Sequence, residues 1–350
     1  MFNNKSNAIS KIVLGAAGAV AGIGLLANAT TPARADIPYN NGFETTDTTT
    51  GIQSWWFGSS GSGSYSINQY QSGASTSTAG FTYTGNAQVS AGNGTATSGN
   101  TWAGAGIQTA TNGGNYYAVI TNNENNNGAG IGDGGYTLFG KSTDASPYSG
   151  TMAAYPGPFT QSVSVYVPVT GTGAWTNNGT STTGYGFEID ETADKAPMAL
   201  SPNWNTEVDF QFSVGASGVD INASDGGAAG GSKGTLALPT ITTNGWYTFA
   251  LTYYKTGNGT TDPVGVTFAE FDQGGNLLGS QSDTLLSAAS SDLGGTNYLW
   301  FTNWASGFAG NQLAIDNVTA TPEPTTLALF AIAGAGALLL LPRRKRQAHV

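Results

Sequence analysis

Acidic residues gather on two short segments of the chain, and carboxylates are the groups in this sequence best suited to chemistry. The first segment holds Glu188, Asp190 and Glu191, and the second holds Glu207 and Asp209. Because side chains alternate along a β-strand, Glu188 and Asp190 are expected on one face of a strand and Glu191 on the other. Two carboxyl groups about 5 Å apart, one of them protonated, can cleave a glycosidic bond with retention of configuration. Glycan hydrolysis by Glu188 and Asp190 is therefore one hypothesis.

The segment from Glu188 to Glu191 resembles the Glu-x-Asp-x-x-Glu signature of jelly-roll glycoside hydrolases of the laminarinase type. The resemblance implies that Glu188 is the nucleophile, that Asp190 assists it, and that a second glutamate is the acid/base. That second glutamate is missing, because its position is Thr192 in the compact form of the signature and Ala193 in the bulged form. A hydroxyl is too weakly acidic to protonate a departing sugar oxygen.

We therefore expect no catalytic residues, and the glycoside hydrolase is kept as the alternative. A β-bulge at Asp190 or Glu191 is the one irregularity that would bring Glu191 onto the face of Glu188. Without a bulge, the same residues are a solvated polar strand face.

The second acidic segment suggests a metal site. If it forms a hairpin with residues 184–190, four carboxylates share one face: Glu188, Asp190, Glu207 and Asp209. Like charges opposite one another destabilise a sheet. Bound Ca²⁺ would relieve the repulsion, since it takes oxygen ligands, and solvent screening is the alternative. The chain has no cysteine and its single histidine is His349, so before that residue it can form neither a thiolate site nor a Ser-His-Asp relay.

Aromatic residues point to sugar binding. The chain has eight tryptophans, and Tyr298, Trp300 and Trp304 are expected on one face of a single strand. Sugar rings stack on exposed aromatic faces, so these three residues are the predicted glycan site. The alternative is that most of the tryptophans belong to the hydrophobic core.

The composition favours a folded chain. Glycine contributes 52 of 350 residues and only 9% of residues are charged, while 38 aromatic residues supply material for a core. From Asp36 to Thr321 there are 20 acidic residues, all but Glu323 of the chain's 21, against four lysines and no arginine, a net charge of −16. Such a segment repels phosphate, so binding to nucleic acid or to anionic lipid is excluded.

Alternating apolar and polar residues predict strands throughout this body and no long helix. Only Asp283 to Ser290 suggests a short helix, and Gly58 to Gly114 is expected to hold long loops or strands with solvent on both sides. About a dozen strands without a linker predict an all-β chain forming one large β-sandwich. The expected strands include residues 52–57, 79–84, 115–121, 163–169, 185–189, 208–214, 247–253, 264–271, 297–304 and 313–319.

Two motifs relate this body to known sandwiches. The last expected strand, Leu313 to Val318, is similar to the closing strand of secreted jelly-roll domains, and Gly42-Phe43-Glu44 with Trp55-Trp56 fits their opening. The body thus resembles concanavalin-like and laminin-G-like jelly rolls. The resemblance implies a single jelly-roll domain over residues 36–321.

The N-terminus has the features of a secretory signal peptide. Lys5 and Lys11 precede the apolar stretch Ile12 to Ala27, and Ala33-Arg34-Ala35 offers a signal-peptidase site. We expect residues 1–35 to be removed, leaving Asp36 as the first residue. An uncleaved N-terminal anchor is the alternative.

The C-terminus combines three elements in order. Pro322-Glu323-Pro324 precedes the uncharged stretch 325–341, which is just long enough for a transmembrane helix, and Arg343-Arg344-Lys345-Arg346 follows. Residues 322–350 resemble the PEP-CTERM sorting signal of Gram-negative bacteria. The resemblance implies transient anchoring in the inner membrane, recognition by an exosortase, and delivery to the outer surface or extracellular matrix. A plain C-terminal anchor would need only the helix and the basic run.

Together these observations predict an exported cell-surface or matrix protein that binds polysaccharide. The expected partners are signal peptidase, an exosortase and an extracellular polysaccharide, with Ca²⁺ as the only expected cofactor. A glycoside hydrolase and a purely structural surface protein are the two alternatives.

Overall fold

β-Strands are the regular elements of the part of the chain that the structure describes. The computed structural model describes residues 39–44, 56–58, 64–84, 89–90, 94–122, 134–138, 159–175, 187–192, 207–225, 236–259, 261–289, 298–302 and 312–322. The chain divides into two units, Met1–Ala35 and Asp36–Val350, and all described residues belong to the second. Within these ranges there is no helix long and apolar enough to cross a membrane. The predicted signal peptide and the predicted helix 325–341 lie outside them.

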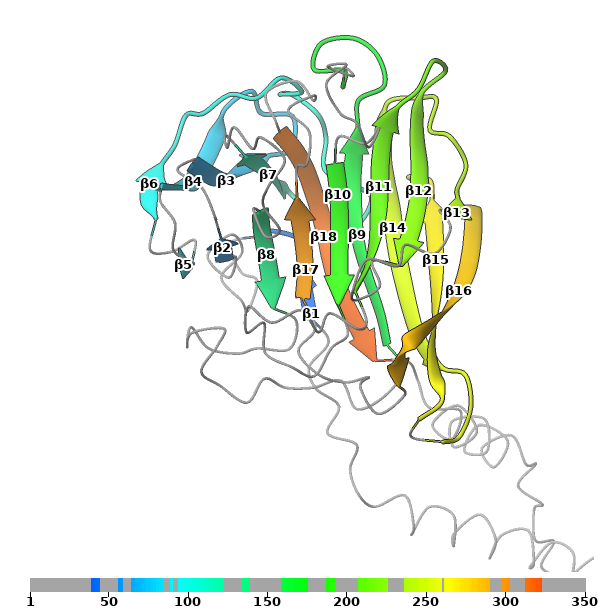
Figure 1. Ribbon diagram of the computed structural model, residues 1–350. Helices are drawn as coiled ribbons and strands as arrows, with labels where there is room; N and C mark the ends of the chain where they lie inside the picture. Colours follow the sequence, from blue (N-terminus) through cyan, green and yellow to red (C-terminus); the bar gives the residue numbers. More distant parts are fainter. Residues whose placement is uncertain are drawn as a thin grey trace, which may run out of the picture. The chain divides into compact units, whose positions relative to one another are not determined.

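The larger of two antiparallel sheets has ten strands in the described part of the chain, in the order β16-β15-β14-β9-β18-β7-β3-β4-β6, with β1 paired to β18 (Figure 1). Its strands are β1 (Tyr39–Asn41), β3 (Ser64–Gln71), β4 (Ser77–Thr84), β6 (Thr95–Thr97), β7 (Tyr116–Asn122), β9 (Phe159–Val167), β14 (Gly245–Lys255), β15 (Pro263–Phe271), β16 (Leu277–Ala289) and β18 (Gln312–Pro322).

The smaller sheet has eight strands in the described ranges, in the order β13-β12-β11-β10-β17-β8-β2-β5. These strands are β2 (Trp56–Gly58), β5 (Val89–Ser90), β8 (Gly134–Leu138), β10 (Phe187–Thr192), β11 (Glu207–Val214), β12 (Val219–Asp225), β13 (Leu236–Ala237) and β17 (Tyr298–Thr302). Along the sequence the chain passes repeatedly from one sheet to the other, so neighbours within a sheet are often far apart in sequence.

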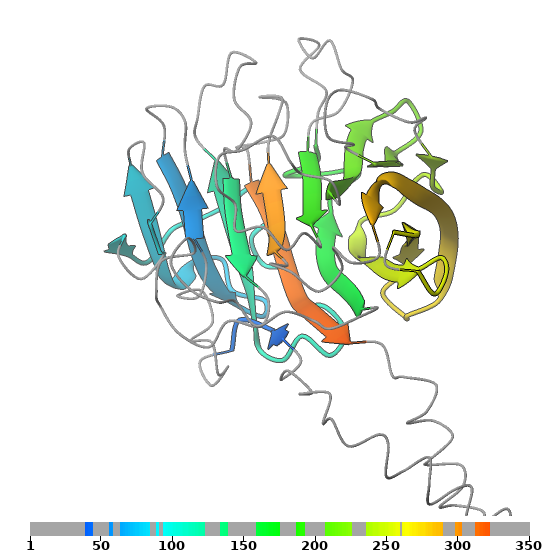
Figure 2. The same ribbon diagram turned by 60° about the horizontal axis from the view of Figure 1, so that its bottom comes forward.

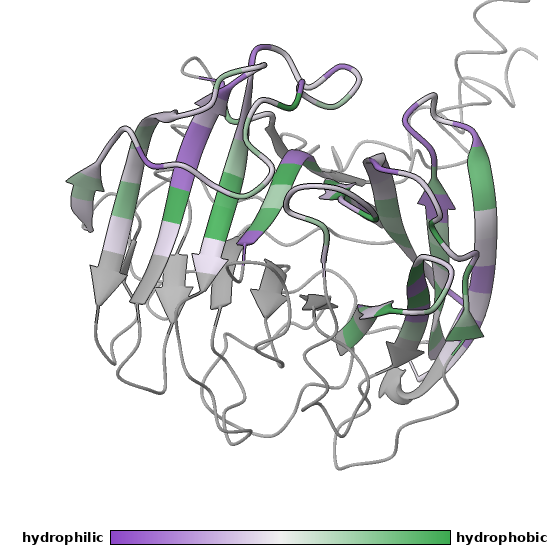
Figure 3. Cartoon of the chain, turned by 90° about the horizontal axis from the view of Figure 1, so that it is seen from above, coloured by the Kyte–Doolittle hydropathy of each residue, from purple (hydrophilic) through white to green (hydrophobic). Residues whose placement is uncertain are grey.

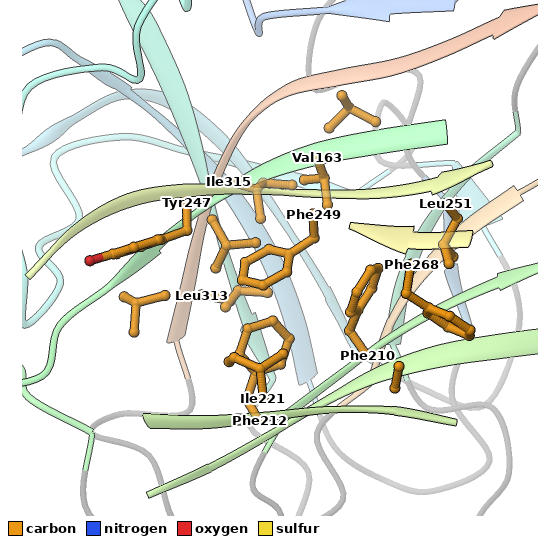
Figure 4. Packing of buried hydrophobic residues seen from close by; sticks show 14 of the residues in the cluster. Val163, Phe210, Phe212, Ile221, Tyr247, Phe249, Leu251, Phe268, Leu313 and Ile315 are labelled. Carbon is orange, nitrogen blue, oxygen red and sulfur yellow. The ribbon is translucent and has the colours of Figure 1, made fainter. Parts of the chain in front are cut away.

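The two sheets pack face to face over one hydrophobic core. Phe210 and Phe212 of β11 meet Phe249 of β14 with ring centroids 5.3 Å and 4.9 Å apart, and Phe210 lies 5.5 Å from Phe268 of β15 (Figure 4). All four rings are completely buried. The predicted all-β sandwich is therefore confirmed, with two antiparallel sheets, and each predicted strand overlaps an observed one.

The strands of the larger sheet form because β-branched and aromatic residues alternate with small polar ones. In β14, Phe249, Leu251 and Tyr253 are buried, while Thr248, Thr252 and other intervening positions are mostly half-buried. Figure 3 shows hydrophobic and hydrophilic residues alternating along these strands. One face of the sheet thus packs on the core and the other faces outward.

Two expectations about secondary structure are wrong. Residues 283–289, expected to begin a short helix, belong to β16, because pairing with β15 outweighs the weak helical preference of a few leucines and alanines. The edge strand β16 curves around β15 (Figure 2). The segment 58–114 was expected to hold long loops or strands with solvent on both sides. Strands with solvent on both sides are wrong for β3, whose residues 66–70 are buried on both faces, whereas the loop from residue 98 to residue 115, between β6 and β7, is long as expected.

A second cluster covers one end of the outer face of the larger sheet. Trp102, in the loop after β6, packs with Tyr70, Tyr117 and Trp246, and Tyr70 stacks on Tyr117 at 5.6 Å. Trp102 Nε1 donates a hydrogen bond to Tyr117 Oη, and Trp246 Nε1 donates one to the carbonyl oxygen of Gln108. Burial raises the pKa of Tyr117 to about 12. Trp102, Trp246 and Trp175 are buried, so for these three the interpretation as core residues is confirmed.

The segment Gly42-Phe43-Glu44 follows the strand that pairs with the last strand of the body, whereas Trp56 lies in β2 of the smaller sheet. β1 pairs with β18, and Glu44, just after β1, accepts hydrogen bonds from the backbone amides of Asn115 and Tyr116. Asp316 of β18 is fully buried and accepts hydrogen bonds from the amides of Ala110 and Asn317. The first and last strands are thereby held to the loop between β6 and β7.

The core also contains an unusual carboxyl group. Glu270 of β15 is fully buried and shares the core face with its cross-strand neighbour Phe249. Neither of its carboxyl oxygens has a hydrogen-bond partner, and the same is true of the buried amide of Gln161 in β9. Burial raises the pKa of Glu270 to about 7.

Candidate functional site

The candidate site is built on the outer face of the smaller sheet, around β10. In β11, Val208, Phe210 and Phe212 are completely buried in the core. Phe187 and Ile189 of β10 pair with Phe212 and Phe210, so these positions share the core face. The alternate positions of β10 are Glu188, Asp190 and Thr192, and they therefore fall on the outer face.

The predicted hairpin of the two acidic segments is confirmed. β10 and β11 are antiparallel neighbours, with Asp190 opposite Asp209, Glu188 opposite Gln211, and Thr192 opposite Glu207. The four predicted carboxylates thus occupy positions on one face of adjacent strands. Two aspartates directly opposite each other destabilise a sheet unless their repulsion is relieved.

The predicted aromatic site and the predicted acidic site lie on neighbouring strands. β17 pairs with the other edge of β10, with Trp300 opposite Asp190 and Tyr298 opposite Thr192. Trp300, Asp190 and Asp209 therefore form one continuous row across three strands. Their separation in sequence gave no sign of this arrangement, because the row depends on which strands pair and in what register.

The same row continues through aromatic positions that were not predicted as site residues. Tyr136 of β8 is the cross-strand partner of Trp300, and Trp56 of β2 is the partner of Tyr136. On the far side, Ser224 of β12 pairs with Asp209. Trp56 and Tyr136 lie in short strands flanked by glycine-rich segments, so only the pairing could identify them.

A neighbouring row is polar and partly sheltered. Gln211 pairs with Glu188 on one side and Asn222 of β12 on the other. Gln211 is only 7% exposed, although it lies on the outer face, and Asn222 is half-buried. The row therefore places two amide residues, Gln211 and Asn222, next to the position of Glu188.

The pairing of β10 is regular along its whole length. No register shift occurs between Phe187 and Thr192 against β11 or between Glu188 and Thr192 against β17. Glu191 therefore falls in the row of Val208, whose side chain is buried in the core. The bulge that would bring Glu191 to the face of Glu188 is not found in this strand. Thr192 keeps the position that the compact hydrolase signature assigns to its acid/base.

The remaining predicted site residues are placed as follows. Pro322 is the last residue of β18 and pairs with Phe159 of β9. Trp304, Glu323, Pro324, Arg343 and Arg344 lie outside the described residues. Among the residues that the structure describes, no group of three acidic, histidine or cysteine side chains is arranged to hold a metal ion. Calcium at Glu188, Asp190, Glu207 and Asp209, whose side chains are not described, stays a prediction.

No protein-family model matches the chain, and no curated protein matches it. Solved structures give weak likenesses. A CBM2 module of the evolved Dit of Lactobacillus casei BL23 phage J-1 has a TM-score of 0.33 at 11% identity, over 54% of this chain and 69% of that one.

Two plant proteins are similar to the same degree. Lectin I-B4 of Griffonia simplicifolia has a TM-score of 0.32 at 13% identity, over 54% of this chain and 80% of that one. Arcelin-5, a lectin-like defence protein of Phaseolus vulgaris, has a TM-score of 0.31 at 11% identity, over 59% and 86%. The fold described above rests on the strand pairing and core of this chain.

Proposed function

We propose that the protein binds a neutral polysaccharide on the outer face of the smaller sheet. The observation that carries the proposal is the direct pairing of Trp300 with Asp190, which in turn pairs with Asp209. An aromatic ring can stack on the apolar face of a sugar, and carboxylates accept hydrogen bonds from sugar hydroxyls. The aromatic residue and the carboxylates each have an ordinary structural explanation when taken alone. Their alignment in one row would let a single glycan stack on the ring and hydrogen-bond to the carboxylates.

The row also suggests how the ligand lies. Neighbouring strands are about 4.8 Å apart, which is comparable to one pyranose unit of an extended chain. Aromatic positions occur on three consecutive strands, with Trp56 on β2, Tyr136 on β8 and Trp300 on β17. A polysaccharide running across the strands would therefore meet one aromatic position per strand before reaching Asp190.

Charge selects the class of polysaccharide. The chain carries a formal net charge of −10, and its body, from Asp36 to Thr321, has no arginine to bind sulfate or phosphate groups. The site itself contains two acidic positions opposite each other. A neutral glycan can approach such a surface, whereas an anionic one is repelled.

Binding is favoured over hydrolysis by the register of β10. The positions that share a face are Glu188, Asp190 and Thr192, and a threonine cannot replace the missing proton donor. Release of reducing ends from laminarin, agar or xylan, eliminated by Glu188→Gln, would instead establish the glycoside hydrolase.

The protein is further proposed to be an exported jelly-roll protein carrying a sorting signal. Repeated crossing of the chain between the two sheets supports the jelly-roll type. The first described strand begins at Tyr39 and the last ends at Pro322, close to the predicted boundaries of the body at Asp36 and Thr321. The intact mass of material recovered from the cell surface tests this, because it should begin at Asp36 and lack Arg343 to Arg346.

Affinity electrophoresis of the purified full-length chain through gels containing laminarin, xylan or agar tests the binding site. Trp300→Ala should weaken binding at least about tenfold, equivalent to about 1.4 kcal/mol. Tyr116→Ala removes a half-buried tyrosine from the larger sheet and serves as the matched control. Equal retardation of wild type and Trp300→Ala on every glycan retained by the wild type would place the site elsewhere.

A further inference from the structure

The outer face of the larger sheet carries rows of hydroxyl groups beyond the part covered by the aromatic cluster. On β14, Thr248 and Thr252 alternate with the buried core residues Phe249 and Leu251. We call these outward positions the hydroxyl face, and it comprises Thr160, Ser162, Thr248, Thr252, Thr267, Ser280, Ser282 and Thr319. All eight side chains are half-buried or exposed.

Most of these hydroxyls are paired with a cross-strand neighbour. Thr160 Oγ1 lies 2.8 Å from Thr252 Oγ1, and Thr267 Oγ1 lies 2.9 Å from Ser282 Oγ. On the other side of β9, Ser162 Oγ lies 2.7 Å from Thr319 Oγ1. A hydroxyl has one donor and two acceptor sites, so the bond to a cross-strand neighbour does not by itself use all of them.

Tyr254 lies at one end of this face and supplies an aromatic surface. Its ring lies against the backbone of Gly265, its partner on β15, because a Cβ atom at Gly265 would meet the ring carbons Cε2 and Cζ. Tyr254 is half-buried, so part of its ring remains accessible. Thr252 on β14 and Thr267 on β15 are the next outward positions along the two strands, and they pair with each other.

On β14, β15 and β16 this face is uncharged, although the protein is strongly acidic. Asp316 of β18, opposite Ser164, is completely buried, and the exposed Lys255 follows Tyr254 in the opposite phase of β14. Among the described outward positions of β14, β15 and β16 there is no acidic or basic residue. The acids of β15 and β16, Glu270 and Asp283, occupy the opposite phase of their strands. A charged partner would find no countercharge here, whereas a neutral ligand rich in hydroxyl groups would find donors, acceptors and an aromatic ring.

We propose that the hydroxyl face is a second binding surface for neutral polysaccharide, with Tyr254 as its stacking residue. The inference rests on the proposed function of the smaller sheet. The two surfaces lie on opposite outer faces of the sandwich, so they bind separate polymer strands. One molecule then joins two chains, and the protein cross-links the polysaccharide that it binds.

Single-molecule two-colour coincidence measures directly whether one protein molecule binds two polysaccharide chains. The purified full-length chain is mixed with laminarin or xylan oligosaccharides labelled with one of two dyes, and single complexes are scored for both dyes. Wild type should hold both dyes, whereas Tyr254→Ala and Trp300→Ala should each hold one, and the double variant none. Tyr254→Phe keeps the ring and should behave as wild type.

The outcomes separate the two proposals. Wild type that binds a single oligosaccharide, with Tyr254→Ala unchanged, overturns the second surface and leaves the proposed function intact. If Tyr254→Ala loses all binding while its melting temperature is unchanged, the second surface is also overturned, because Tyr254 and Trp300 would then belong to one site. Wild type that binds no neutral oligosaccharide overturns the proposed function and this inference with it.

Discussion

The two faces of the larger sheet differ in how their polar side chains are hydrogen-bonded. On the outer face, Thr160 pairs with Thr252 and Thr267 pairs with Ser282. On the core face, Glu270 and Gln161 are completely buried and their side chains have no hydrogen-bond partner. The same strands carry both arrangements, so strand pairing alone does not satisfy polar side chains.

This difference in hydrogen bonding depends on which residue lies opposite each polar side chain on the neighbouring strand. A short hydroxyl across an antiparallel pair reaches another hydroxyl directly, because facing Cβ atoms are about 5 Å apart. Glu270 has Phe249 and Gly279 as its cross-strand neighbours, and neither offers a side-chain donor. Burial without a hydrogen-bond partner disfavours the charged form of Glu270, and this raises the pKa of the carboxyl to about 7.

Replacing Glu270 should have the largest effect on this contrast. Glu270→Leu removes a buried carboxyl without a partner and fills the same space with an apolar side chain. We expect the free energy of unfolding at pH 8 to increase by about 1 to 3 kcal/mol, the usual cost of an unsatisfied buried polar group. Denaturant unfolding measures it, and a destabilised variant would show that Glu270 has a favourable role in the fold.

Calcium should have the next largest effect, on the outer face of the smaller sheet. An ion bound only by the folded protein at ten times its dissociation constant stabilises by about 1.4 kcal/mol. We expect millimolar Ca²⁺ to raise the melting temperature relative to chelator, because it would relieve the repulsion between Asp190 and Asp209. Asp209→Asn should reduce the response, and an identical melting temperature with and without Ca²⁺ would favour solvent screening.

The pH dependence of stability should also report Glu270. Its pKa is raised from 4.5 to about 7 in the folded protein, so between these values the folded state holds a proton that the unfolded state has released. This contribution to stability is complete below about pH 4.5 and is lost as the pH rises through 7. Glu270→Gln should therefore flatten the decline measured between pH 5 and pH 8.

Asp272 provides the control for that experiment. It lies just after β15, is half-buried at the surface, and its pKa is lowered by hydrogen bonds from Asn276. Asp272→Asn should leave the decline between pH 5 and pH 8 in place. If both variants flatten the curve equally, the decline does not come from the buried carboxyl.

The smallest expected effect comes from the hydroxyl face. Thr252→Val keeps the shape of the side chain and removes its hydrogen bond to Thr160, which should cost about 0.5 to 1 kcal/mol of stability. The double variant with Thr160→Val and Thr252→Val should lose less stability than the sum of the losses in the two single variants, because both partners are then apolar. Additive losses in this double-mutant cycle would mean that the pair contributes nothing beyond its separate side chains.

Local pattern predicted the strands that have one apolar face and failed where that pattern is absent. β9, β11 and β14 alternate clearly between core and outward residues, and all three were predicted. β3, with the sequence SYSINQYQ, shows little apolar alternation, because parts of the chain cover both of its faces. β16 was mistaken for a helix at its C-terminal end, where only pairing with β15 defines it.

The sequence by itself determined the all-β class, the facing of Glu188 with Asp190, and the grouping of Tyr298 with Trp300, because alternation is a property of each strand's own backbone. Only the tertiary structure decided that Trp300 stands next to Asp190, that Tyr136 and Trp56 extend the row, and that Glu270 is enclosed without a partner. Such neighbours come from strands far apart in sequence, and their register depends on how two sheets bury their apolar faces against each other.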